Sequence, residues 1–144
     1  MIDDIFELAK KDPVKNYVLT PPQMEMYIEN KRNPDSVMYN CAICLPCKRG
    51  DLNLGRLIEA IQKAVDNHVA FRVRIDDSGK MPVMKEIKDF HLEIPVIETD
   101  DLIKEKKRLI RPFDLKNENL IRCYILLCEE DCEILFDMHH IIID

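Results

Sequence analysis

The sequence predicts a mixed α/β (α+β) two-layer sandwich, because one long amphipathic helix and two β-hairpins alternate along a chain of 144 residues. Strands with alternating apolar residues indicate one hairpin at 71–75 and 82–87 and another at 120–128 and 132–138. A chain of this length is typical of one domain and can bury about 68–70% of the surface it exposes when unfolded. The helix, at about 53–68, shows its stripe at Leu54, Leu57, Ile58, Ile61, Ala64 and Val65.

The N-terminal third is expected to hold two helices followed by a strand. Residues 2–11 suggest a short amphipathic helix that Pro13 ends. The run Thr20-Pro21-Pro22-Gln23 is a strong helix start, with a capping threonine, prolines in the first turn and glutamine three residues after the cap. Asn33-Pro34-Asp35 ends this second helix, and residues 37–48 alternate as a strand does.

The C-terminal half is expected to add a strand at 91–98 and a helix at 101–110, followed by an irregular link at 111–115. Three lysines of that helix are interpreted as a solvated face. They are Lys104, Lys106 and Lys107.

The last strand ends in two adjacent histidines. If its geometry continued, His140 would share a face with Phe136 and Met138, and His139 would lie on the opposite face.

Composition narrows the classes of function. The formal net charge of −6 argues against nucleic acid binding, because phosphate recognition needs a basic surface. No apolar run approaches the ~20 residues that span a bilayer. The first residues are acidic where a signal peptide would be basic, so we expect a cytoplasmic protein.

Six cysteines raise the question of a metal site. On a strand, residues three apart point to opposite faces, so Cys41 and Cys44 are not expected to face one ion. We therefore interpret the cysteines as ordinary reduced core residues, as expected in a reducing compartment. The others are Cys47, Cys123, Cys128 and Cys132.

The final six residues run from His139 to Asp144 and contain two histidines and an aspartate. Histidine has an unperturbed pKa near neutrality and can take up and return a proton within one turnover. Two histidines at a strand end are, however, more commonly packed or surface residues than catalysts. His68 is interpreted as a structural helix-end histidine rather than a metal ligand, because no acidic or cysteine partner lies at ligand spacing.

Four segments, in order, resemble the N-terminal part of a nonribosomal peptide synthetase condensation domain, which has the chloramphenicol acetyltransferase-like fold. Residues 17–23 resemble its opening motif, and residues 67–73 resemble its Arg-His-x-x-Leu-Arg-Thr motif. Residues 111–115, with 120–122, resemble its Pro-Phe-Asp-Leu and Pro-Leu-Arg segment. Residues 139–144 match its active-site motif His-His-x-x-x-Asp.

The resemblance implies a role for each matching residue. His140 would be the catalytic histidine, acting as a base or by positioning and electrostatic stabilisation, and His139 would be structural. Asp144 would pair with Arg72 and hold the histidine loop, since arginine grips a carboxylate with two hydrogen bonds. A solvated Asp144 at the chain end is the alternative. Asn67 stands where the family usually has arginine.

The resemblance also implies a domain organisation and partners. Residues 1–16 would be a leader or linker helix, and residues 17–144 the N-terminal subdomain, cut at the active-site motif. The active site of the family lies between this half and a second one. We therefore expect the isolated chain to be inactive and to associate with itself through the face it leaves bare.

The implied activity is amide-bond formation between an acyl or peptidyl thioester and an acceptor amine. The substrates would ride on the phosphopantetheine arms of carrier proteins, with no cofactor or metal bound by the chain itself. Two alternatives stay open. One is a related acyltransferase, ester-forming or epimerising enzyme with the same motif, and the other is a non-catalytic module that docks carrier proteins.

Overall fold

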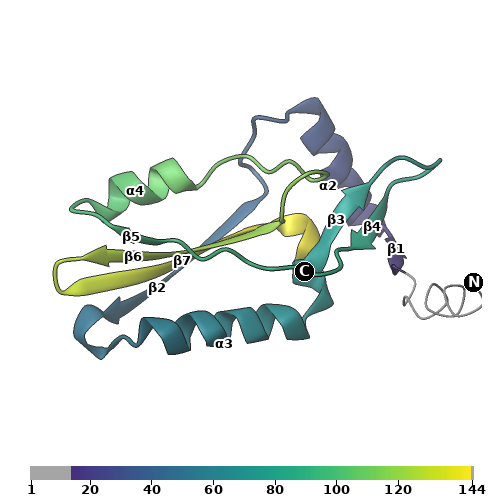
Figure 1. Cartoon of the computed structure of the whole chain (residues 1–144). Coiled ribbons are helices and arrows are strands. Elements are labelled where there is room, and N and C mark those ends of the chain that lie inside the picture. The colour runs from purple at the N-terminus through teal and green to yellow at the C-terminus, as the bar shows by residue number, and fades with distance from the viewer. Residues whose placement is uncertain (1–13, 144) are drawn as a thin grey trace, which may run out of the picture.

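The computed structural model describes residues 14–143 and contains two separate sheets flanked by three helices (Figure 1). A four-stranded sheet has the strand order β2-β7-β6-β5 and a three-stranded sheet the order β1-β4-β3. The strands are β1(Asn16–Val18), β2(Asn40–Lys48), β3(Val73–Asp76), β4(Val83–Glu86), β5(Val96–Glu98), β6(Ile121–Cys128) and β7(Asp131–His139). The helices are α2(Pro21–Arg32), α3(Leu54–Asn67) and α4(Leu102–Leu109), with 3-10 turns η1(Arg49–Asp51), η2(Val69–Arg72) and η3(His140–Ile142).

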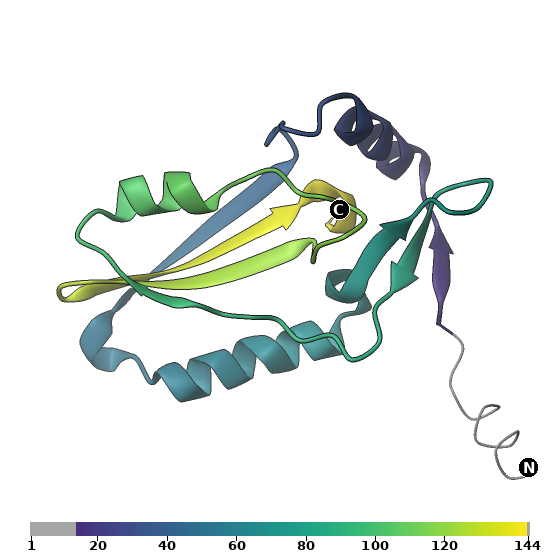
Figure 2. The same ribbon diagram turned by 45° about the horizontal axis from the view of Figure 1, so that its top comes forward.

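The two faces of the four-stranded sheet are covered by different helices, as Figure 2 shows. Ile125 and Leu127 of β6 pack against α3, whereas Leu126, between them, packs against α4. This alternation follows from the period of two in a strand. β6 and β7 form an antiparallel hairpin, β2 runs antiparallel to β7, and β5 runs parallel to β6. The predicted α/β fold is confirmed.

Both long helices begin where the sequence predicts. The Thr20 side chain accepts from the backbone N–H of Gln23, and the Gln23 side chain accepts from the backbone N–H of Thr20, completing a capping box before α2. Asn53 accepts from the N–H of Arg56 at the start of α3. These caps satisfy N–H groups that have no partner within the helix. No helix among residues 14–143 is long and apolar enough to cross a membrane.

The predicted strand at 91–98 is wrong over most of its length, because β5 contains only Val96–Glu98. The backbone N–H of Leu92 donates to the Gln62 side chain of α3 at 3.1 Å instead of joining the sheet. Pro95 has no N–H for the ladder and offers only its carbonyl, which accepts from Ile125. The predicted helix at 2–11 lies outside the described residues.

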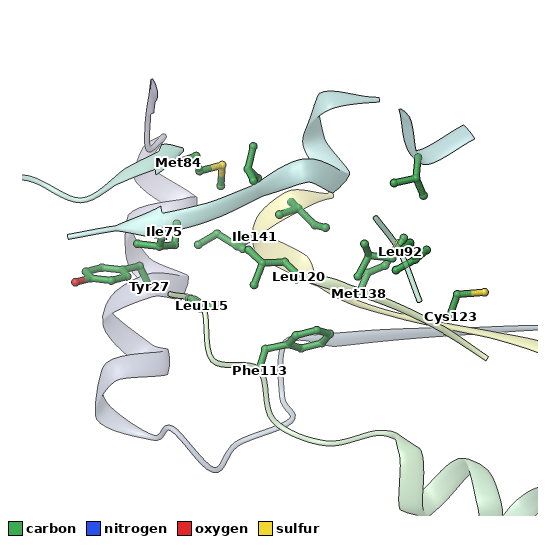
Figure 3. Packing of buried hydrophobic residues seen from close by; sticks show 14 of the residues in the cluster. Tyr27, Ile75, Met84, Leu92, Phe113, Leu115, Leu120, Cys123, Met138 and Ile141 are labelled. Carbon is green, nitrogen blue, oxygen red and sulfur yellow. The ribbon is translucent and has the colours of Figure 1, made fainter. Parts of the chain in front are cut away.

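The largest apolar cluster joins the three-stranded sheet, α2 and the open end of the β6–β7 hairpin, where β6 begins and β7 ends (Figure 3). Leu120 is fully buried just before β6, and Ile141 is 1% exposed just after β7. Ile75 from β3 and Tyr27 from α2 complete the same cluster. The turn that follows β7 is therefore anchored in the core by its apolar side chain.

The cysteines correct one prediction. Cys47 on β2 and Cys132 on β7 lie directly opposite each other and form a disulfide, so the reduced state expected for these two is wrong. Their pairing depends on the register of strands 85 residues apart, which the local spacing of cysteines does not reveal. Burial raises the pKa of the Cys123 thiol to about 12. The free cysteines of the described chain are Cys41, Cys44, Cys123 and Cys128.

Candidate active site

The two histidines of the terminal motif lie in opposite environments at the end of β7. His139 is the last residue of the strand and is 3% exposed, whereas His140 begins the turn η3 and is exposed. The strand geometry does not continue through His140, so its side chain does not join the apolar face that carries Phe136 and Met138. The His140 side chain is exposed instead.

Four hydrogen bonds hold the backbone around His140. The His140 N–H donates to the Tyr39 carbonyl at 2.8 Å, and the His140 carbonyl accepts from the Ile143 N–H at 3.2 Å. The Ile141 N–H donates to Nδ1 of His139 at 3.1 Å, and the Ile141 carbonyl accepts from Nε2 of Gln23 at 3.1 Å. The backbone of His140 is therefore fixed, while its imidazole is exposed.

His139 packs between aromatic rings and acts as a hydrogen-bond acceptor. Its ring centroid lies 6.0 Å from that of Tyr39 and 5.9 Å from that of Phe113. Burial, with a smaller contribution from the charge of neighbouring His140, lowers the pKa of His139 to about 4. Because Nδ1 accepts from Ile141, the proton of the neutral ring lies on Nε2. His139 is therefore uncharged at neutral pH and shapes the turn.

A pocket of about 300 Å³ opens beside His140. One wall is the start of α2, with Pro22, Gln23 and Met26, and the other is the turn from His140 to Ile143. The pocket places an imidazole beside apolar side chains and one amide. Such a group can exchange a proton with a bound reactant or stabilise charge that develops on it.

Arg72 ends η2 and has one carboxylate partner among the described residues. Its Nη1 donates to Oε1 of Glu86 at 3.0 Å, and both side chains are 23% exposed. Its Nε is buried and makes no hydrogen bond within residues 14–143. Asp144 lies outside the described residues, so the pairing of Arg72 with Asp144 stays a prediction.

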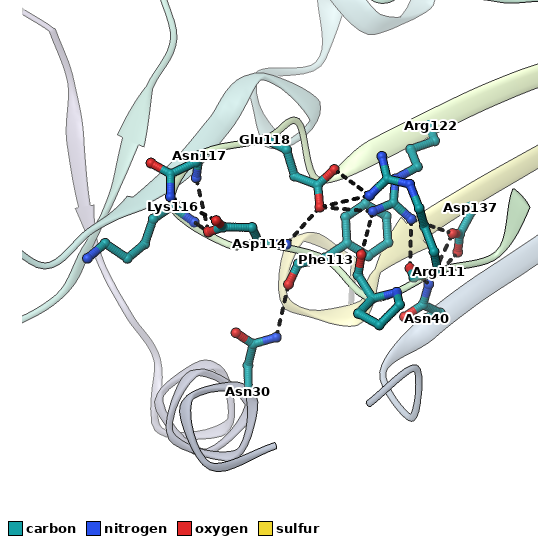
Figure 4. Close-up of polar contacts among 11 residues, drawn as sticks. Asn30, Asn40, Arg111, Phe113, Asp114, Lys116, Asn117, Glu118, Arg122 and Asp137 are labelled. Carbon is teal, nitrogen blue, oxygen red and sulfur yellow. Dashed lines mark hydrogen bonds and ion pairs between the residues drawn. The ribbon is translucent and has the colours of Figure 1, made fainter. Parts of the chain in front are cut away.

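A buried polar network surrounds Arg122 (Figure 4). Arg122 donates from Nη1 to Asp137 at 3.1 Å and from Nη2 to Glu118 at 2.9 Å. It also donates to the carbonyls of Arg111 and Pro112, both at 2.7 Å. Its guanidinium stacks 3.6 Å from the centroid of the Phe113 ring, the ring that also contacts His139. The network therefore fixes one wall of the His139 site.

Asp137 is the acidic member of this network, and sequence reasoning did not single it out. Its side chain is fully buried on β7, and both carboxylate oxygens accept from Nδ2 of Asn40 at 3.0 Å. Burial raises the pKa of Asp137, while Asn40 and Arg122 favour its charged form. The available signal was an aspartate between the apolar residues Phe136 and Met138 of a strand, since a buried charge requires a partner.

His68 and the lysines of α4 lie outside the candidate site. His68 caps the C-terminus of α3, and its Nδ1 lies 2.7 Å from the Ala64 carbonyl, as expected of a structural helix-end histidine. Lys104 and Lys107 are exposed as predicted. Lys106 is only partly exposed, and its Nζ donates to Glu133 of β7 at 2.5 Å, so the prediction of a solvated lysine is wrong for this residue. Among the described residues, no group of three or more potential metal ligands comes together.

Comparison with known proteins gives consistent results. The family model for the condensation domain matches residues 14–144. Surfactin synthase subunit 2 of Bacillus subtilis (strain 168) is 31% identical over 140 residues, which are 95% of this chain and 4% of that protein. Gramicidin S synthase 2 of Brevibacillus brevis is 32% identical over 131 residues, covering 89% of this chain and 3% of that protein.

The solved structures agree at the level of fold. A four-domain nonribosomal peptide synthetase in its holo form, bound to AMP and glycine, superposes with a TM-score of 0.79 at 17% identity. That match covers 91% of this chain and 11% of the synthetase. A starter condensation domain of rhizomide synthetase superposes with a TM-score of 0.76 at 20% identity, over 90% of this chain and 34% of that one.

The chain thus spans a small part of each relative, and the likeness extends over nearly all of its own length. The family match includes the opening motif at the start of α2 and the His-His-x-x-x-Asp ending. On these grounds the chain belongs to the condensation domain family.

Proposed function

We propose that the protein carrying this chain joins an acyl or peptidyl thioester to an acceptor amine, with His140 as the catalytic residue. The observation that carries the proposal is the position of His140. It is the exposed histidine of the family motif, it borders a pocket of about 300 Å³, and its backbone is held on both sides.

In this reaction the amine nitrogen attacks the thioester carbonyl carbon. The carbon–nitrogen bond forms, the carbon–sulfur bond breaks, and the proton lost by the amine ends on the departing thiolate. His140 would carry that proton, or hold the amine and stabilise the charged intermediate. A general base contributes typically about 10²–10⁴-fold in rate. His139 is a poor candidate, because it is buried, its low pKa makes it a weak base, and its Nδ1 already accepts from the Ile141 N–H.

The proposed partners are acyl or peptidyl carrier proteins, whose phosphopantetheine arms would deliver both substrates. The similarity to surfactin synthase subunit 2 and the structural likeness to a four-domain nonribosomal peptide synthetase support this. The chemistry proposed requires no cofactor held by the chain. The thioester is already activated, and proton transfer and charge stabilisation are within the capacity of an imidazole.

The test is product formation by the full-length protein. Wild-type protein supplied with a carrier-bound acyl thioester and an amine acceptor should release an amide, identified by its mass, and His140→Ala should not. His91→Ala is the matched control, since His91 is exposed and lies outside the His140 pocket. Amide formation by His140→Ala at the wild-type rate would overturn the catalytic assignment.

The same assay separates the alternatives. An ester-forming relative would use an alcohol in place of the amine, and an epimerising relative would return the thioester with inverted stereochemistry and no new bond. A docking module would bind the carrier protein equally well with and without His140 and show no turnover.

A further inference from the structure

The Gln23 side chain connects two segments that are far apart in the chain. Its Oε1 accepts from the backbone N–H of Thr20 at 2.9 Å, and its Nε2 donates to the carbonyl of Ile141 at 3.1 Å. A carboxamide has an acceptor oxygen and a donor nitrogen, and here both ends are in use. The start of α2 is therefore joined directly to the turn that carries His140.

The peptide groups on either side of Ile141 are fixed by side chains from two different elements. The N–H of Ile141 is held by His139, at the end of β7, and its carbonyl is held by Gln23, from α2. The Ile141 side chain is 1% exposed in the core. Rotation of either peptide would break one of these bonds, so together they set the direction in which the preceding His140 leaves the backbone.

The capping role of Gln23 does not explain why this residue is an amide. A capping box needs only a side-chain oxygen at this position, and glutamate supplies one as well as glutamine does. The donor nitrogen matters only for the Ile141 carbonyl. The chemistry of the side chain therefore separates the cap from the contact with the turn.

We propose that Gln23 is a positioning residue, which aims the His140 imidazole by holding the Ile141 carbonyl. The inference rests on the proposed function, because it assigns Gln23 a role in the reaction of His140. A catalytic group displaced by about 1 Å can lose about 10²-fold in rate. The loss should appear in turnover rather than in folding.

The test compares two variants that break different halves of this arrangement. Gln23→Glu keeps an acceptor for the Thr20 N–H and replaces the donor with an oxygen that repels the Ile141 carbonyl. Thr20→Ala removes the capping hydroxyl and leaves the donor of Gln23 in place. Gln23→Met, of similar size and without polar atoms, serves if the glutamate variant does not fold.

The first readout is the single-turnover rate of the full-length protein. We expect Gln23→Glu and Gln23→Met to lower it by about 10²-fold. Thr20→Ala keeps the donor of Gln23 but alters the edge of the His140 pocket, so we expect it to lower the rate by less than about tenfold. Wild-type turnover by both Gln23 variants would overturn the inference, as would an equal loss in Thr20→Ala.

The second readout is independent of the reaction. In the 144-residue chain, the ring signals of His140 in NMR spectra should shift and broaden much more in Gln23→Glu than in Thr20→Ala. An unchanged His140 signal in Gln23→Glu contradicts the positioning role. If wild-type protein forms no amide, the proposed function fails, while this readout still decides whether Gln23 holds the imidazole.

Discussion

At the scale of single residues, burial decides what each of the two adjacent histidines can do. His139 is enclosed by Tyr39 and Phe113. It is uncharged at neutral pH, because its pKa lies near 4. His140, one residue later, is exposed beside the pocket. The strand ends between them, so one histidine builds the turn and the other is presented by it.

The buried histidine predicts a pH-dependent stability. The pKa of His139 is about 4 in the folded chain and about 6.5 when unfolded, so between these values the unfolded state binds more protons. The stabilisation is complete above pH 6.5 and is lost as the pH falls through 4. The loss should approach roughly 3 kcal/mol, at about 1.4 kcal/mol for each pKa unit.

Urea denaturation of the chain at pH 7.5, 6 and 5 measures this effect as the change in unfolding free energy. His139→Asn is the matched variant, since its side-chain oxygen can accept from Ile141 and does not titrate. Asp137 has a raised pKa and acts in the opposite direction, but it is present in both proteins. Equal slopes for wild type and His139→Asn would contradict the account.

At the scale of elements, Arg122 fastens the irregular link 111–118 to the β6–β7 hairpin. It binds two carbonyls and Glu118 of the link and Asp137 of β7. The link brings Phe113 against His139. One arginine therefore ties a segment without regular structure to the hairpin at several points.

Arg122→Met should lower the unfolding free energy by about 3–5 kcal/mol, because it leaves the Asp137 carboxylate buried without its charged partner. The double variant Arg122→Met with Asp137→Leu should recover much of that loss, since no unpaired charge remains. Arg49→Met is the control, because its ion pair with Glu98 is exposed and should contribute less than about 1 kcal/mol. Denaturant titration measures all three, and equal losses for Arg122→Met and Arg49→Met would refute the prediction.

Elements that depend on neighbouring residues could be predicted from the sequence, whereas those that depend on distant segments could not. The starts of α2 and α3 depend on neighbours three residues apart, at Thr20 and Asn53, and both were predicted from the sequence. The short β5 and the Cys47–Cys132 pairing depend on contacts with distant segments, and both predictions were wrong. The contact between Gln23 and Ile141 spans 118 residues, so no local pattern reveals it.

At the scale of the whole molecule, β2 is an outer strand of the four-stranded sheet and carries exposed apolar side chains. Ile43 and Leu45 are both 47% exposed on the face that α3 covers elsewhere, and Met38, just before the strand, is 62% exposed. Apolar patches of this kind mark surfaces that associate with other proteins. Pro46 and Lys48 disfavour backbone pairing of the β2 edge with another chain. The exposed apolar side chains on the face of the sheet are therefore the surface through which association is expected.

We therefore predict weak self-association of the 144-residue chain through this face. Replacing Ile43 and Leu45 with lysine should weaken association by at least about tenfold, because the charges must be desolvated on contact. Ile103→Lys on α4 is the control, since Ile103 is 66% exposed and lies elsewhere. Sedimentation equilibrium measures the dissociation constants, and a wild-type chain that stays monomeric at high concentration would contradict the prediction.

The most direct test of the central claim is to replace each of the adjacent histidines in turn and to measure both turnover and stability. In the full-length protein, His140→Ala should reduce single-turnover amide formation by about 10²–10⁴-fold and leave the unfolding free energy nearly unchanged. His139→Asn should keep most of the turnover and lose the pH dependence of stability between pH 6.5 and 4. Full turnover by His140→Ala, or its loss only in His139→Asn, would contradict the account.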